Sequence, residues 1–120
     1  MTTSNVSEKA SWFVGKVERG QAEQFLMEHG RQREFLVRER TARDGYYALS
    51  IRYHYSCKHF NIDPKDGQFC MGALTFSSIE EVIRHYQQNS LFIHDNQHVT
   101  LGQPVKKRTR HSVEKHSINA

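Results

Sequence analysis

This sequence of 120 residues lacks long apolar runs and an export signal, and it has only two cysteines. No apolar run approaches the ~20 residues that a membrane-spanning helix needs, so we expect no transmembrane segment. Residues 1–11 are polar and hold no apolar stretch typical of a secretory signal. Two cysteines, Cys57 and Cys70, without such a signal favour free thiols in a reducing, cytoplasmic compartment.

The sequence also lacks internal repeats and low-complexity linkers, and its length leaves room for one domain with short tails. Residues 106–120 hold five basic residues and one acidic residue, which equals the whole net charge of +4. Residues 1–105 are therefore neutral, with 12 basic and 12 acidic side chains. We expect a polar lead over 1–10, a domain over 11–106 and a disordered basic tail over 107–120.

Apolar spacing predicts the first elements of the domain. The apolar segment 12–14 suits an edge strand. Segment 21–29 places Ala22, Phe25, Leu26 and His29 at i, i+3, i+4 and i+7, which predicts a helix that ends at Gly30. Three consecutive apolar residues within 34–40 predict a strand that is buried on both faces.

The second half of the domain reads as further strands and a second helix. We expect strands over 46–55, 58–62 and 68–71, with a turn over 63–67. Ser77 and Glu80 have the spacing of a capping box, and the apolar stripe of the helix that follows is Ile79, Val82, Ile83 and Tyr86. We expect a long polar loop over 87–103. This order predicts an α+β fold, with a central antiparallel sheet and one helix on each face.

Arg38 is the residue that points to a function, because it lies within the apolar strand at the middle of the sheet. A buried guanidinium without a partner costs several kcal/mol, so a compensating contact is expected. One interpretation is an internal ion pair with Glu34 or Glu39. The other is a fixed, permanently charged fork that receives a dianionic ligand through two hydrogen bonds.

The strand that contains Arg38 resembles the signature strand of Src-homology-2 domains. Four other segments also resemble that family: 12–17 followed by Arg19, 58–60, Phe76 with 85–86, and 104–105. The resemblance covers about residues 11–106, and within the family residues 69–72 and the helix with Glu80 look most like the Nck adaptors. It implies a module that docks an adaptor or signalling protein onto tyrosine-phosphorylated partners, without catalytic activity or cofactor.

The resemblance also implies residue roles. Arg38 would hold the phosphate, Arg19 would contact the phosphate and the tyrosine ring, and His59 would form the pocket wall. Phe60 would separate this pocket from a second, apolar pocket, for which the candidates are Met71, Leu74, Tyr86 and Leu91. Core packing is the alternative role for each of these apolar residues. Acidic residues just after the phosphotyrosine and an aliphatic residue about three positions on would be preferred.

Two positions depart from the family pattern near the phosphate. The residue two after the strand arginine is usually a hydroxyl residue and here is Arg40, and Asn61 replaces a basic residue after the fourth-strand aromatic. Residues two apart on a strand point to the same face, so we expect Arg40 to share the phosphate contact, with Thr41 supplying a hydroxyl or backbone donor. The alternative is that the strand ends at Glu39, so that Arg40 projects into solvent or pairs with Glu39 or Asp44.

Three rival functions can be compared with this one. A cysteine phosphatase needs an arginine six residues after its thiolate, but those positions hold Asp63 and Phe76, and no phosphate loop or nucleophile elbow occurs. His54, Cys57 and His59 lack zinc-finger spacing, so we expect no metal. The basic tail leaves an alternative function open, namely salt-dependent binding of nucleic acid or an acidic membrane.

Overall fold

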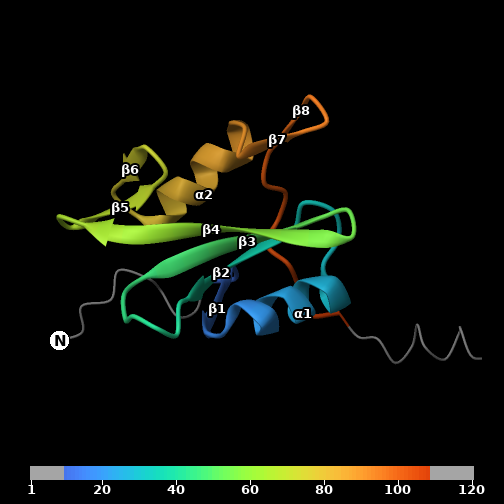
Figure 1. Cartoon of the computed structure of the whole chain (residues 1–120), viewed down its shortest axis with the longest axis horizontal. Coiled ribbons are helices and arrows are strands. Elements are labelled where there is room, and N and C mark those ends of the chain that lie inside the picture. The colour runs from blue at the N-terminus through green and yellow to red at the C-terminus, as the bar shows by residue number, and fades with distance from the viewer. Residues whose placement is uncertain (1–9, 109–120) are drawn as a thin grey trace, which may run out of the picture.

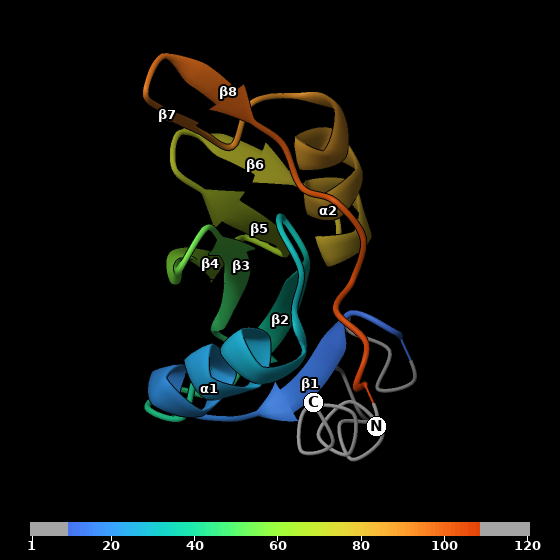
Figure 2. The ribbon, with the colours of Figure 1, turned by 90° about the vertical axis from the view of Figure 1, so that its right-hand side faces the viewer.

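The computed structural model describes residues 10–108, and Figure 1 shows how the elements are arranged. In chain order they are β1 (Phe13–Lys16), α1 (Arg19–His29), β2 (Phe35–Glu39), β3 (Tyr47–Tyr53), β4 (Ser56–Lys65), β5 (Gln68–Met71), β6 (Leu74–Phe76), α2 (Ile79–Gln88), β7 (Phe92–His94) and β8 (Gln97–Val99). Within these residues a six-stranded sheet runs in the order β1 to β6, and α1 and α2 lie on opposite faces of it (Figures 1 and 2). This confirms the predicted α+β class.

The central strand β2 divides the interior into two clusters. Phe35 and Val37 are fully buried in the larger cluster, which includes the apolar stripe of α2. Leu36 points to the other face and packs with Ala22 and Leu26 of α1. The prediction of a strand buried on both faces is confirmed, and this position fixes Arg38 on the α1 side, because side chains alternate along a strand.

Helix α1 begins at Arg19, two residues before the predicted start, and its last turn is capped by a side chain from the sheet. The guanidinium of Arg52 donates hydrogen bonds to the carbonyl oxygens of Leu26, Met27 and Gly30, at 3.2, 3.3 and 3.0 Å. Carbonyl groups at a helix C-terminus lack partners within the helix, so a cation there satisfies both hydrogen bonding and the helix dipole.

Strand β4 is longer than predicted, because the expected turn over 63–67 begins only after Lys65. Residues 56–62 of β4 pair with β3, whereas residues 63–65 pair with β5. The two halves of β4 therefore have different partner strands. Pro64 lacks an N–H but lies in the short ladder with β5 that ends at Lys65 and Gln68. Strand β1 pairs with β2 in parallel, whereas the other pairs of this sheet are antiparallel.

At the N-terminus of α2, the capping residue lies one position later than predicted. Ser78, and not Ser77, is the N-cap, and its hydroxyl accepts a hydrogen bond from the N–H of Glu81 at 3.1 Å. The carboxylate of Glu81 in turn accepts from the N–H of Ser77 at 3.0 Å. The reciprocal pattern is therefore centred on Ser78 and Glu81. The predicted apolar stripe of α2 is buried as expected.

The predicted loop over 87–103 is wrong, since it contains the antiparallel hairpin of β7 and β8. Asp95 and Asn96 both have positive φ, of 50° and 65°, as a tight hairpin turn requires. After β8 the chain runs past α2 and back along the start of β2, as Figure 2 shows in orange and red. There the N–H of Val105 donates to the carbonyl of Phe35 at 2.8 Å.

Three features of the described chain bear on the remaining expectations. Both Cys57 and Cys70 are free thiols. Within residues 10–108 no helix combines the length and the apolar character needed to cross a bilayer. Arg108 forms a two-bond ion pair with Glu34, at 2.8 and 3.0 Å, so this residue of the predicted tail contacts the domain. The rest of that tail lies outside the described residues.

Candidate phosphate and peptide site

Arg38 lies near the end of β2 with only 6% of its surface exposed. One guanidinium nitrogen, Nη1, donates to the carbonyl of Val17 at 3.3 Å. Its Nε is buried and has no hydrogen-bond partner within the described residues. An unpaired buried donor on a charged group is costly, because it has lost water without gaining a replacement.

The predicted ion pairs of Arg38 are absent among residues 10–108. Glu34 is bound to Arg108, and the carboxylate of Glu39 accepts from the N–H of Gly45 at 2.8 Å. Burial lowers the pKa of Arg38 from its ordinary value, and the charges of Arg19 and Arg40 lower it further. The electrostatic surroundings of Arg38 therefore favour an incoming anion.

Arg19 and His59 lie beside Arg38, and Glu23 connects them. The Nε2 of His59 lies 2.7 Å from Oε2 of Glu23, and the same oxygen lies 3.6 Å from Nε of Arg19. The other ring nitrogen of His59 lies 2.7 Å from the hydroxyl of Ser50. Burial lowers the pKa of His59, although the hydrogen bond to Glu23 opposes this shift. A neutral ring that donates to Glu23 and accepts from Ser50 satisfies every partner.

Arg40 does not follow Arg38 along the strand, because β2 ends at Glu39. Its Nη1 lies 2.6 Å from Oδ1 of Asp63, and its guanidinium lies 5.3 Å from the ring centre of Tyr46. The structure thus has Arg40 in an ion pair, as the alternative interpretation held, but with Asp63 as the partner. Thr41 is exposed in the turn that follows. A part for either residue in phosphate binding stays a prediction.

The turn that joins β2 and β3 is held in place from several sides. Lys16 of β1 forms an ion pair with Asp44. The guanidinium of Arg43 lies over the ring of Tyr46, 3.9 Å from its centre. Together with the bond from Gly45 to Glu39, these contacts give the turn a defined shape beside the buried arginine.

Strand β4 presents different chemistry on its two faces. His59 points toward α1 and the arginines, whereas Phe60 points toward the other face and packs against the larger apolar cluster. The ring of Phe60 stacks on Phe92 of β7, with centroids 6.0 Å apart and an angle of 24°. Lys58 lies 5.3 Å from the centre of the same Phe92 ring. Phe60 therefore follows a residue of the arginine side on the strand and itself faces the apolar side, and its role between two ligand pockets stays a prediction.

The other predicted residues of the apolar pocket separate into two groups. Met71 and Tyr86 are buried in the core, so packing accounts for both. Leu74 is 44% exposed, and Leu91 is half-buried against the cluster. Phe92 is not among the residues predicted from the sequence, because segment 87–103 is predicted to be a loop. The apolar residues 91–93 followed by Asp95 and Asn96 are the hairpin signal that would have found it.

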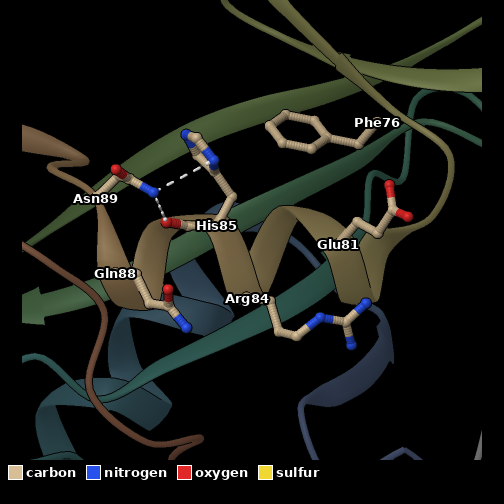
Figure 3. A pocket seen from close by; sticks show the side chains of 6 residues that line it. All are labelled: Phe76, Glu81, Arg84, His85, Gln88 and Asn89. Atoms are coloured by element: carbon tan, nitrogen blue, oxygen red, sulfur yellow. Dashed lines mark hydrogen bonds between the residues drawn. The ribbon is translucent and has the colours of Figure 1, made fainter.

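A depression of about 440 Å³ lies beside α2, and Figure 3 shows the side chains that line it. It is lined by Phe76, Glu81, Arg84, His85, Gln88 and Asn89. None of the predicted site residues lies in it. The polar side chains of α2 point outward there, and the amide of Asn89 donates to the carbonyl of His85 at 2.9 Å. The depression is separate from the arginine site.

A buried arginine whose Nε has no partner among residues 10–108, with a second, exposed arginine beside it, suits an anionic group. In agreement with this, the family model of the SH2 domain matches residues 12–86. The chain belongs to the SH2 domain family. SH2 domains dock phosphotyrosine-containing partners, and this chain is a docking module of that kind.

Individual relatives cover the same region. The SH2/SH3 adapter protein dreadlocks of Drosophila melanogaster is 29% identical over 82 residues, which are 68% of this chain and 15% of that protein. The guanine nucleotide exchange factor VAV3 of Homo sapiens is 38% identical over 81 residues, which are 67% of this chain and 9% of that protein. The solution structure of the SH2 domain of a Monosiga brevicollis CRK/CRKL homolog has a TM-score of 0.69 at 25% identity, covering 84% of this chain and 92% of that one.

These relatives define the domain and not a whole protein. The chain spans well under a third of the length of the curated adaptor and exchange-factor relatives named above. The more specific resemblance to the Nck adaptors stays a prediction.

Proposed function

We propose that this domain binds peptides that carry phosphotyrosine, with Arg38 as the residue that holds the phosphate. The observation that carries the proposal is the unpaired, buried Nε of Arg38, which leaves a permanently charged fork without a carboxylate partner in residues 10–108. A phosphotyrosine brings close to two negative charges and three acceptor oxygens. It would satisfy this donor and offset the cost of burying the guanidinium.

The remaining site residues contribute to phosphate binding to different extents in this proposal. Arg19 is 71% exposed in its side chain, and its ion pair within residues 10–108 is with Glu23 at 3.6 Å, so Arg19 can close over the phosphate or the ring. Neutral His59 forms the wall. Arg40 and Thr41 adjoin the pocket from the turn and contribute at longer range, since Arg40 is already paired with Asp63.

The apolar surface beside Phe60 would read the residues that follow the phosphotyrosine. Phe60, Phe92 and Leu91 form its floor, and Leu74 lies exposed on β6. Lys58 lies close to this floor and would favour acidic residues near the phosphotyrosine, before an aliphatic residue about three positions on. Backbone shape and apolar fit would then contribute to selectivity together with charge.

The module would act without catalysis, without a metal or cofactor, and in the cytoplasm, where tyrosine-phosphorylated proteins are reached in a reducing setting. Binding of nucleic acid through the basic tail is the weaker candidate, because the charge of Arg108 is already committed to Glu34.

An array of peptides in phosphotyrosine, phosphoserine and unphosphorylated forms tests the proposal. We expect binding of phosphotyrosine forms alone. Equal binding of the unphosphorylated forms would contradict it.

A further inference from the structure

Glu23 is an acidic residue in a site that otherwise attracts anions. Its Oε2 approaches both Nε2 of His59, at 2.7 Å, and Nε of Arg19, at 3.6 Å. The carboxylate of Glu23 therefore contacts two of the side chains that adjoin Arg38, namely His59 and Arg19. Its own side chain is 42% exposed, so it stays hydrated at the pocket edge. The charges of Glu23 and Arg19 both act on Arg38.

We propose that Glu23 is a resident counter-anion that competes with the ligand phosphate for Arg19 and so sets the affinity of the site. In the empty site, Glu23 holds Arg19 along α1. When a phosphate enters, Arg19 must break its contact with Glu23. Glu23 then remains beside the dianion and repels it. This inference rests on the proposed phosphotyrosine function.

The arrangement explains why the repulsion persists across the neutral pH range. The hydrogen bond from His59 lowers the pKa of Glu23, so this carboxylate stays charged. The charged and titratable groups around it are Arg19 on its own helix, His59 and Cys57 on β4, and Arg38 on β2. His59 is held neutral by burial and does not cancel the negative charge of Glu23.

The change Glu23→Gln removes the charge and keeps an oxygen that accepts from His59. We expect a phosphotyrosyl peptide to bind about three- to tenfold more tightly, which is the effect of removing one charge a few ångströms from a dianion near a surface. Glu28→Gln is the matched control, with the same change of net charge near the other end of α1, and should change affinity by less than about 1.5-fold. Calorimetry on the whole chain at low salt measures both.

A spectroscopic readout separates this role from a structural one. The second ionisation of a phosphotyrosine has a pKa of about 6. Without Glu23 the dianion is better stabilised, so the pKa of the bound phosphate should fall in the Glu23→Gln complex, as followed by phosphorus NMR. The Glu28→Gln complex should match the parent. In an Arg19→Gln background the gain from Glu23→Gln should be smaller than in the parent, because the competition for Arg19 is gone and only the repulsion of the dianion remains.

The outcomes are distinct. Tighter binding together with a lower phosphate pKa supports the competition. Unchanged or weaker binding by Glu23→Gln, with parent-like thermal unfolding, overturns it and leaves the phosphotyrosine function intact. If the Glu23→Gln protein unfolds, Glu23→Asp, which retracts the charge, should still bind more tightly than the parent, and weaker binding overturns the inference. A parent chain that binds no phosphotyrosyl peptide overturns the function and this inference together.

Discussion

At the residue scale, the site depends on an arginine, Arg38, that the fold buries without giving every N–H donor a hydrogen-bond partner. Among the residues that the structure describes, Arg38 gives one hydrogen bond, to Val17, and its Nε has no partner. The sheet around it is closely packed, so this cost is met by burial of neighbours such as Val37 and Leu36. A ligand that completes the hydrogen bonds of Arg38 gains what the empty domain lacks.

The change Arg40→Ser tests how far the turn contributes to the phosphate site. The side chain of Arg40 is held by Asp63, yet its charge reaches Arg38. We expect phosphopeptide affinity to fall by about two- to fivefold, with a shallower salt dependence, because one nearby positive charge is lost. Titrations at two salt concentrations measure this. Improved affinity would show that Arg40 has no part in binding.

The sequence indicated Arg38 but not the partner of Arg40, and the reason is local. The sequence predicts a turn at Asp63, because Pro64 and Gly67 are both turn residues. In the structure Asp63 pairs with Cys70 in a ladder of β4 and β5, which brings its carboxylate toward Arg40. A partner set by register between strands cannot be read from the spacing of one segment.

At the element scale, Arg52 links β3 to the end of α1. It donates to three carbonyl groups of the helix and the residue beyond it. Arg52→Gln should lower the free energy of unfolding by about 1–3 kcal/mol, since these acceptors lose a charged donor. Denaturant titration measures the change. Arg84→Gln on the exposed face of α2 is the control, and an equal effect of both variants would contradict the capping role.

The hairpin of β7 and β8 is the element that positions Phe92 on Phe60. Phe92→Ala should flatten the preference for an aliphatic residue after the phosphotyrosine and weaken peptide binding by about three- to tenfold, because the aromatic floor is lost. Ile93→Ala is the control, since Ile93 is 60% exposed and follows Phe92 on the opposite side of the strand. A degenerate peptide library reads the preference, and matching profiles for the two variants would remove Phe92 from the site.

Sequence patterns predicted long elements better than short ones. Helix α2 and strand β2 were found because their burial repeats over several residues, as Val82 and Val37 illustrate. Strands β6, β7 and β8 are three residues each and hold at most one buried side chain, too few for a period to emerge. Their positions follow from tertiary packing, and with them the placement of Phe92.

At the scale of the whole molecule, the buried His59 makes stability depend on pH. Burial lowers the pKa of His59 below its ordinary value of 6.5. The unfolded chain therefore takes up a proton near that value, whereas the folded chain does so only at lower pH. The free energy of unfolding should fall as pH drops from about 7 to about 5.5, and His59→Gln should make this fall smaller. An identical pH dependence in both proteins would contradict a neutral, buried His59.

The central claim is that Arg38 holds the ligand phosphate, and calorimetry of Arg38→Ala with a phosphotyrosyl peptide tests it most directly. Two charge-assisted hydrogen bonds of roughly 1.5–3 kcal/mol each predict binding at least about a hundredfold weaker. The fold should survive, because within residues 10–108 the guanidinium bonds only one backbone carbonyl. Arg84→Ala should bind like the parent. Binding by folded Arg38→Ala within about threefold of the parent would contradict the account.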